Sequence, residues 1–496
     1  MTPRLARPLL LAALALGALA DWLLRADSWR AGFVAWALLV LGVAFVASER
    51  STGDAAGGAR DRRLLFGAAA ALVLLLVLRD ASTLYALDFF AFIVVCFLIA
   101  WRAGGRALTQ LEPRDALIGA ASAAAASIAG APTLALHDAE PAAITDDVRR
   151  KYRNFAIGAL AAAPVLLVVA LLLGTADPLF AGFLEEAGNL LDTKLAEHLG
   201  FVAVASWATA GALRGSLVRV GIRGDAFRAA PQLSFGIVAP LLGGLALLLS
   251  IWIGLQVRTL FGGAEYVAVT AGVTVAEYAR QGFFELIVIA GIVLAALLVT
   301  DDVLDREHEG ERAKFRALGT LLVLLVAAVL TSAVLRLGLY LKHFGLTDDR
   351  VLALAVLVWV ALVLGWFALT VLRGARARFA PGVLVLSAAW LGGLNLANPE
   401  RVVVQTNLAR AERGLPFDVA YHATLSADAV PALQRGAERL DAVQAEALRV
   451  ALAEEWAKRA ERRADWRRWS LPFVLVSQRF EGGDAGAASE AVKPPA

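Results

Sequence analysis

A few charged and amide side chains at the ends of apolar stretches are the residues of this sequence best suited to chemistry. Glu285 follows the run Glu277–Phe284 and lies just inside an apolar stretch. A carboxylate there needs a cation, a water-filled cavity or a proton, because an isolated charge is costly in lipid. Arg336 lies four residues before Tyr340, so both share one helix face, and Arg336 is the expected partner of Glu285. Such a pair can act as an acid or base beside an anion-binding group.

Further polar residues follow at the ends of the next apolar stretches. The glycine turn Gly345–Arg350 contains Thr347, which is suited to cap a helix, and Asn398 before Pro399 predicts a helix end and a turn. The candidate polar site is the following set: Tyr278, Arg280, Glu285, Arg336, Tyr340, Arg350, Asn395, Asn398, Arg401, Asn407, Arg410, Asp418, Tyr421 and Asp428. The alternative is that Glu285–Arg336 and Asn407–Arg410 are structural links between helix ends.

The elements that must position these residues follow from composition. Of the 496 residues, 59% are hydrophobic and 18% are charged, whereas an average soluble domain has about 25% charged residues. The mean hydropathy is +0.67. So few charged residues cannot cover the surface of a soluble protein. Lipid must therefore surround part of the chain.

Eleven apolar stretches approach the length of about 20 residues that a transmembrane helix needs. They are residues 7–23, 31–47, 64–79, 84–101, 155–174, 198–214, 232–256, 284–300, 317–335, 351–372 and 381–397. The predicted fold class is therefore all-α: a polytopic transmembrane helical bundle of about 11 helices with a small soluble helical C-terminal region.

Basic residues in the loops predict the side of the membrane that each loop occupies. With the N-terminus in the cytoplasm, the cytoplasmic stretches hold more than twice as many Lys and Arg residues as the opposite loops before residue 398. An odd number of helices then places the C-terminal tail outside the cytoplasm, on the same side as the candidate polar site. The basic excess is thus a topology signal, and we expect no nucleic-acid partner.

The predicted organisation has five parts. They are an N-terminal four-helix membrane segment (1–101), a cytoplasmic loop (102–154), a membrane core of about seven helices (155–397), an extracytoplasmic helical tail (398–480) and a disordered terminus (481–496). Residues 115–135 and 262–282 each fit an interfacial helix or a weak span, and we favour the former. The first stretch fits a retained helix, with a signal peptide cleaved after Ala18–Ala20 as the alternative.

A helix is predicted in the tail over residues 426–469, with Ser426 or Asp428 as its cap and Pro431 in its first turn. The end of this helix, from Arg462 to Trp469, is basic and rich in tryptophan. Two interpretations stay open for it. It contacts anionic lipid headgroups, or it is a solvated helix end whose cations face the helix dipole.

Metal sites, disulfides and familiar catalytic motifs are not expected. Cys96 is the single cysteine and the five histidines are scattered, so neither an intramolecular disulfide nor a zinc site is predicted. The sequence contains no P-loop, no H-E-x-x-H and no G-x-S-x-G motif. We therefore expect no cofactor and assign no catalytic residue.

Several motifs together resemble one bacterial membrane family. They are Glu277–Leu286, Arg336–Tyr340 with Gly345–Arg350, Asn395–Pro399 with Asn407 and Arg410, Asp418–Tyr421 followed by Leu425–Leu433, and Ala176–Phe180. Over about residues 155–435 the chain resembles the polytopic family catalogued as domain of unknown function 4173. His422 and Glu400 depart from the pattern, where an apolar residue and Asp are expected. The resemblance implies a bacterial inner-membrane protein with many helices, and it implies no reaction.

Three functions fit these features. The favoured one is a multi-pass inner-membrane protein of the cell envelope, embedded in the lipid bilayer, whose outer polar site binds a partner such as anionic lipid or an envelope component, or senses a signal. The second is an enzyme acting on a lipid-linked or envelope substrate, with Glu285 as acid or base and Arg336, Arg350 or Arg401 holding a phosphate or carboxylate. The third is a transporter, which an absent internal repeat and few mid-membrane charges disfavour.

Overall fold

The described residues fold into helices. The computed structural model describes residues 3–25, 29–51, 56–103, 130–138, 193–217, 233–261, 283–304 and 309–482. Among them the only β-type pairing is an isolated parallel bridge between Leu233 and Leu304. The prediction of an all-α fold is confirmed.

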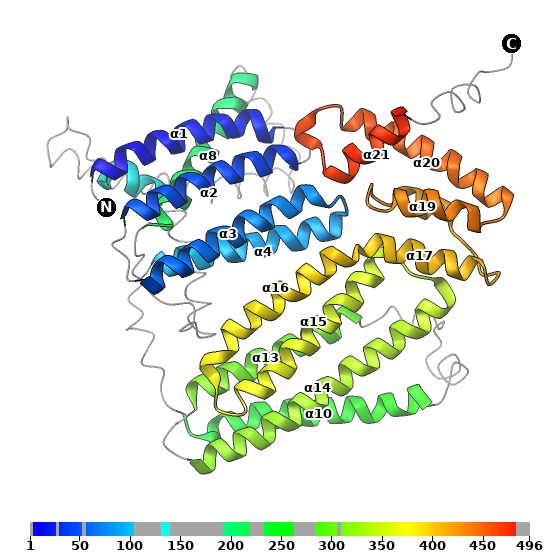
Figure 1. Ribbon diagram of the computed structural model, residues 1–496. Helices are drawn as coiled ribbons and strands as arrows, with labels where there is room; N and C mark the ends of the chain where they lie inside the picture. Colours follow the sequence, from blue (N-terminus) through cyan, green and yellow to red (C-terminus); the bar gives the residue numbers. More distant parts are fainter. Residues whose placement is uncertain are drawn as a thin grey trace, which may run out of the picture.

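Five helices from the first half of the chain form one bundle. They are α1 (Pro3–Leu24), α2 (Ala31–Ser51), α3 (Ala56–Leu78), α4 (Ser82–Ala103) and α8 (Thr193–Gly215) (Figure 1). The core of this bundle is made of alanine, leucine, valine and phenylalanine side chains. α1 and α8 approach so closely that a Cβ added at Gly17 would lie 1.9 Å from Ser206 Oγ. Small residues allow such contacts between membrane helices.

Five later helices form a second bundle. They are α10 (Phe235–Phe261), α13 (Phe283–Val303), α14 (Glu309–Phe344), α15 (Asp348–Thr370) and α16 (Phe379–Ala397). The core includes Leu297, Leu322 and Phe367, which are fully buried. α4 contacts both α15 and α16, and so it joins the two bundles.

The C-terminal region lies against one end of both bundles (Figure 1). It contains α17 (Pro399–Ala411), α18 (Val419–Thr424), α19 (Val430–Gly436), α20 (Ala442–Arg462) and α21 (Leu471–Gly482). Residues 466–468 form a short 3₁₀ turn, η5. α17, α18, α19 and α20 share a small apolar core around Leu408, Leu433 and Leu448.

We call the bundle end that carries this C-terminal region the tail end, and the opposite end the loop end. Residues 79–81 and 345–347 lie at the tail end, because both contact residues 398–430. Residues 371–378, the last turn of α13 and the first turn of α14 lie at the loop end (Figure 1).

The single long tail helix predicted over residues 426–469 is wrong. Pro431 does stand in the first turn of a helix, but that helix is the short α19, which ends at Gly436. α20 begins after Asp441, whose side chain accepts a hydrogen bond from the backbone N–H of Gln444. Ser426 and Asp428 bind other loops rather than capping a helix, as shown below.

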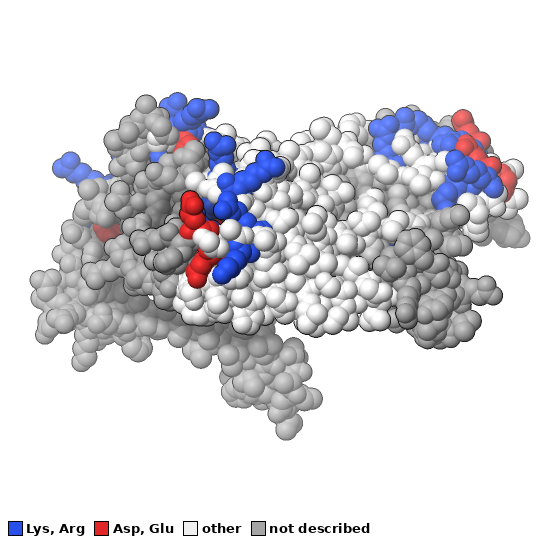
Figure 2. All heavy atoms as spheres, turned by 90° about the horizontal axis from the view of Figure 1, so that it is seen from below, with Lys and Arg blue, Asp and Glu red and all other residues white. Residues whose placement is uncertain are grey.

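Within the described residues, eight helices are long and apolar enough to cross a membrane. They are α1, α2, α4, α10, α13, α14, α15 and α16, at eight of the eleven predicted stretches. The stretches 64–79 and 198–214 are helical as α3 and α8 but are not among these eight. Figure 2 shows Lys, Arg, Asp and Glu near both ends of one face and an uncharged band between them. The chain is therefore a membrane protein.

Several predictions concern segments outside the described residues. These segments are the stretch 155–174, residues 104–129 and 139–154 of the predicted loop 102–154 with most of the predicted helix 115–135, the segment 262–282 and residues 483–496 of the predicted terminus. The expected count of about 11 spans thus stays a prediction, as do the orientation and the division into domains.

Candidate functional site

Two loops exchange carboxylate hydrogen bonds at the tail end. Asp428 Oδ2 accepts hydrogen bonds from the backbone N–H groups of Asp80 and Ala81, the second at 3.0 Å. In return, Asp80 Oδ2 accepts a hydrogen bond from the backbone N–H of Ala427 at 3.0 Å. We call this reciprocal arrangement of Asp80 and Asp428 the carboxylate clasp. It joins the α3–α4 connection to the α18–α19 connection.

Arginines from two distant segments neutralise the Asp80 side of the clasp. Arg463 Nη1 lies 2.7 Å and Arg30 Nη1 lies 3.4 Å from Asp80 Oδ1, and the Ser470 hydroxyl donates to the same oxygen at 2.6 Å. Asp80 is only 2% exposed. Burial disfavours its charge, but the guanidinium groups of Arg30 and Arg463 outweigh burial and lower the pKa of the Asp80 carboxyl.

The network continues from the clasp into the membrane bundle through Arg79. Arg79 Nη1 lies 3.3 Å from Asp428 Oδ1, and Arg79 Nη2 donates to the carbonyl oxygen of Asn395. Asn395 Nδ2 donates in turn to Oδ1 of Asp88, a fully buried residue of α4, at 2.9 Å. Polar groups therefore connect the tail with an ionisable side chain between α4 and α16. Ionisable residues inside membrane bundles often mark functional sites.

Glu400 is a second buried carboxylate beside the clasp. Its Oε2 accepts hydrogen bonds from the Ser426 backbone N–H at 3.0 Å and from the Ser426 hydroxyl at 2.5 Å. Burial raises the pKa of Glu400 to about 7; the Ser426 hydrogen bonds oppose this rise, and the charges of Asp428 and Asp80 add to it. Glu400 therefore changes charge near neutral pH.

Asn398 fixes the turn that brings α17 to the clasp. It ends α16 with φ 53°, the one positive φ of a non-glycine residue among the described residues. Asn tolerates this left-handed conformation better than most residues. Its Oδ1 accepts from the Arg401 backbone N–H at 3.2 Å, and its Nδ2 donates to the Asp428 carbonyl at 3.3 Å. The predicted helix end at Asn398 is confirmed.

Asn407 and Arg410 both hold the turn between α14 and α15. Asn407 Oδ1 accepts from the Leu346 backbone N–H at 2.9 Å, and its Nδ2 donates to the Leu346 carbonyl at 2.7 Å. Arg410 donates to the Leu341 carbonyl at 3.0 Å. Gly345 has φ +75°, and an added Cβ would lie 2.8 Å from Asn407 Oδ1. Glycine is thus required on two grounds, and this half of the site is a backbone clamp.

Tyr421 and His422 extend the clamp. The Tyr421 hydroxyl accepts from the Asp348 backbone N–H and donates to Asp348 Oδ1, both at 2.9 Å. His422 Nδ1 donates to the Asp418 carbonyl at 2.6 Å, which leaves Nε2 to accept from Asn407 Nδ2 at 3.0 Å. Burial lowers the pKa of His422, so the ring is neutral at pH 7.

The remaining candidate residues lie apart from these contacts or outside the described side chains. Arg336 is buried on α14, where its guanidinium carbon lies 5.6 Å from the Trp252 ring centroid. Arg350 donates to the carbonyl oxygens of Phe344 and Gly345. Tyr278 and Arg280, and the side chains of Glu285 and Tyr340, fall outside the described part. The pair Glu285–Arg336 therefore stays a prediction.

The basic segment 462–469 makes intramolecular contacts. Arg463 binds Asp80, and Arg467 pairs with Asp465 and donates to the Trp22 carbonyl. The rings of Trp466 and Trp22 lie 6.0 Å apart, centroid to centroid. These contacts bring the segment onto the tail-end tip of α1, and binding of anionic lipid there stays a prediction.

A comparison with known families decides where the chain belongs. The family model described as "Domain of unknown function (DUF4153)" matches residues 66–436, most of the chain. The chain belongs to the DUF4153 family. The prediction of an uncharacterised family is confirmed. The predicted family number, 4173, is wrong, because the matching model is 4153. No curated protein and no solved structure matches the chain.

The DUF4153 match covers the clasp but not all its partners. Asp80, Glu400 and Asp428 lie within residues 66–436, while Arg30 and Arg463 lie outside this range. In this DUF4153 protein the reciprocal hydrogen bonds thus belong to the matched region, and two of the neutralising arginines come from flanking segments.

The sequence-based candidate site missed the residues that complete the network, namely Arg30, Arg79, Asp80, Asp88, Glu400, Arg463 and Ser470. The position of Asp88 carried a usable signal of a functional residue, because a carboxylate inside a predicted transmembrane helix is unusual. Arg30 and Asp80 carried a weaker one, as charged residues in very short loops between predicted spans. No sequence spacing relates Asp80 to Asp428, which are 348 positions apart.

The site has the chemistry of a charged link between the tail and the membrane bundle. The described residues include no group of three or more His, Cys, Asp or Glu side chains placed to hold a metal ion. The carboxylates of Asp80, Asp428 and Glu400 are buried and bound by donors. The arrangement can hold the tail, carry a proton at Glu400 and alter the polar contacts that reach Asp88.

Proposed function

We propose that this chain is a multi-pass protein of the bacterial inner membrane that serves the cell envelope through a polar site on the extracytoplasmic side. The observation that carries the proposal is the network at the tail end, which runs from Arg463 through Asp80 and Asp428 to Arg79, Asn395 and Asp88. Binding of an envelope component at the tail would change contacts that continue into the membrane bundle. This arrangement suits a protein that binds a partner or senses a signal.

The distribution of basic residues supports the proposed orientation. The sequence segments next to helix ends at the loop end contain many more Lys and Arg residues than the segments at the tail end before residue 398. Basic loops are typical of the cytoplasmic side. On this basis the N-terminus lies in the cytoplasm, and residues 398–482 lie outside it.

A membrane-bound enzyme is the second candidate, and one contact favours it. The Glu400 carboxylate accepts a 2.5 Å hydrogen bond from the Ser426 hydroxyl, and its pKa near 7 suits a general base. Glu400 is buried whereas Ser426 is partly exposed. In such an enzyme Ser426 would meet the substrate, so Ser426→Ala would abolish function.

Complementation of a deletion strain tests the proposed function. Cells that lack the chain are expected to become sensitive to detergents and to bulky antibiotics that an intact envelope excludes. The wild-type gene should restore resistance, and Glu400→Gln should fail to restore it although the protein reaches the membrane at the wild-type level. Glu446→Gln, which removes an exposed acid of the same region, should restore resistance fully.

Each of the other outcomes of this complementation experiment would contradict or change the proposed function. A deletion strain with an intact envelope contradicts the envelope role. Rescue by Glu400→Gln to the wild-type level shows that the network is only structural. Complete loss of function in Ser426→Ala as well as in Glu400→Gln favours a reaction at the hydroxyl, whereas function retained in Ser426→Ala favours the binding or sensing role.

A further inference from the structure

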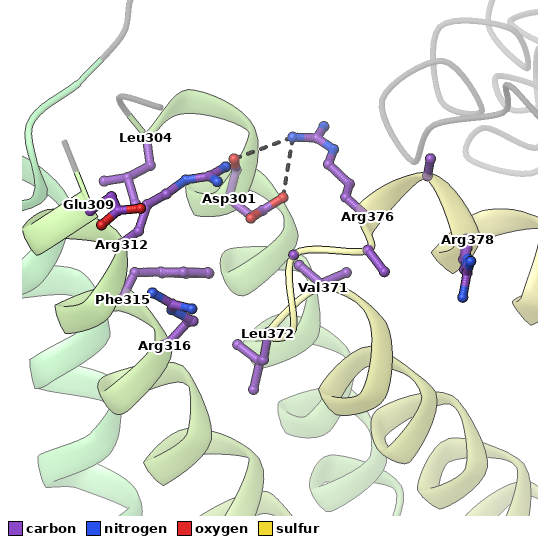
Figure 3. A pocket seen from close by; sticks show the side chains of 13 residues that line it. Asp301, Leu304, Glu309, Arg312, Phe315, Arg316, Val371, Leu372, Arg376 and Arg378 are labelled. Atoms are coloured by element: carbon purple, nitrogen blue, oxygen red, sulfur yellow. Dashed lines mark hydrogen bonds and ion pairs between the residues drawn. The ribbon is translucent and has the colours of Figure 1, made fainter. Parts of the chain in front are cut away.

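A hollow of about 770 Å³ opens at the loop end, among the ends of four apolar helices (Figure 3). α13 and α15 end beside it, α14 begins beside it, and the turn η3 (Arg376–Arg378) leads from it into α16. All four helices are candidate membrane spans. The hollow therefore lies where the apolar band of the protein meets water.

Four arginines line the hollow and outnumber its acids. Arg312 and Arg316 come from α14, Arg376 and Arg378 come from η3, and the acids are Asp301 and Glu309. Arg376 is already neutralised, because its guanidinium lies 3.2 Å from Asp301 Oδ2 and also pairs with Asp302. These ion pairs anchor η3 to the end of α13.

The guanidinium groups of the other three arginines have hydrogen-bond donors available for a ligand. Within the described part of the chain, the side chains of Arg312, Arg316 and Arg378 make no hydrogen bond or ion pair. A guanidinium group binds phosphate oxygens through two parallel hydrogen bonds and keeps its charge at any physiological pH. Three such groups around one hollow favour a ligand with a phosphate group.

Apolar side chains line the hollow on the side nearer the membrane helices, beside Arg316. Phe315, Val371 and Leu372 line it, and Figure 3 shows Val371 and Leu372 nearer the helices than the charged groups of Asp301 and Arg376. A soluble phosphate would leave this apolar side uncovered. A ligand with a charged head and hydrocarbon chains would match both parts.

We infer that the hollow binds the phosphate headgroup of an anionic phospholipid. Arg312 and Arg316, which lie together on α14 in Figure 3, hold the phosphate, and Arg378 adds positive charge at the far side of the hollow. The acyl chains lie along the apolar surface that begins at Val371 and Leu372. Basic pockets between membrane helices at the water boundary are typical sites for anionic headgroups. The hollow lies at the opposite end from the carboxylate clasp, so the inference does not depend on the function proposed for the tail end.

Native mass spectrometry of the purified full chain in detergent tests this site. The probes are short-chain phosphatidylglycerol, phosphatidylcholine with the same chains, and glycerol phosphate. We expect phosphatidylglycerol to bind at least tenfold more tightly than the other two. The variant with Arg312→Gln, Arg316→Gln and Arg378→Gln should bind it on the order of a hundredfold more weakly, because each arginine near a membrane surface contributes roughly fivefold.

A matched variant controls for the loss of charge. It carries Arg413→Gln, Arg435→Gln and Arg449→Gln, which are exposed arginines of the C-terminal region. It should bind phosphatidylglycerol as the wild type does, and circular dichroism should show that both variants are folded. Equal phosphatidylglycerol binding by the two variants overturns the assignment. Equal binding of glycerol phosphate and phosphatidylglycerol to the wild type shows that the ligand is a soluble phosphate and overturns the lipid assignment.

Discussion

Asp80→Asn is expected to destabilise the protein by about 3–5 kcal/mol, the usual cost of removing one partner from a buried ion pair. Asn keeps the size of the side chain but withdraws the charge that Arg30 and Arg463 share. Both cations would then lie partly buried without an anion. Thermal unfolding of the purified protein in detergent should show the loss directly.

The damage should begin in the tail. Hydrogen exchange is expected to speed up in the α18–α21 region of Asp80→Asn, while α10 and α14 keep the exchange rates of the wild type. Glu446→Gln is the matched control, because Glu446 pairs with Arg449 on the exposed surface of α20 and exposed pairs contribute about 1 kcal/mol or less. If Asp80→Asn is as harmless as this control, the clasp does not hold the tail.

Glu400→Gln is expected to remove a pH dependence of stability between about pH 5 and pH 8. The folded-state pKa of Glu400 is about 7, against an ordinary value of 4.5. Between these values the folded state keeps a proton that the unfolded state has released, so stability falls as pH rises. Above pH 7 the buried charge costs about 3 kcal/mol, from 1.36 kcal/mol per pKa unit. Below pH 4.5 this cost is absent.

The thermal midpoint measured from pH 5 to pH 8 reports this effect. The wild type should lose stability with rising pH, and Glu400→Gln should follow a flatter curve and be the more stable protein at pH 8. Gln keeps a carbonyl oxygen that can accept the Ser426 hydrogen bonds. Glu438→Gln replaces an exposed glutamate nearby and should leave the wild-type slope unchanged. A wild-type slope in Glu400→Gln would show that another group titrates.

The membrane helices were largely predictable because one continuous stretch of sequence determines each helix. A run of about 20 apolar residues needs no distant partner to form a helix in lipid. α3 and α8 illustrate where this signal weakens. The N-terminal part of α3 contains Arg60, Arg62 and Arg63. The first turns of α8 contain Lys194, Glu197 and His198. Such helices need packing within a bundle as well as apolarity.

The site was predicted only in part because its contacts join distant segments. Asn395, Asn398 and Asp428 were recognisable from turn chemistry and helix ends. Their partners Asp80 and Arg463 come from a two-helix connection and from the far end of the tail. Only the folded chain brings these segments together.

Local sequence signals also misled in one place. Ser426 or Asp428 was expected to cap a helix, since both are good capping residues, but Glu400 and the α3–α4 connection bind them instead. For Asn407 and Arg410, the alternative to a polar site was a structural link between helix ends. They bind the backbone of Leu346 and Leu341 near Gly345, whose left-handed conformation is not visible in the sequence alone.

Thiol cross-linking between Trp22→Cys and Trp466→Cys, in a Cys96→Ala background, tests the central claim most directly. These two side chains are exposed and their rings are neighbours across the contact between α1 and η5. A short, membrane-impermeant bifunctional maleimide applied to intact spheroplasts should link them within one chain, and adding Asp80→Asn should abolish the link. The single-cysteine variants reveal links between separate chains. No link under any condition would contradict docking of the tail, and a link formed only after detergent opens the membrane would contradict its extracytoplasmic location.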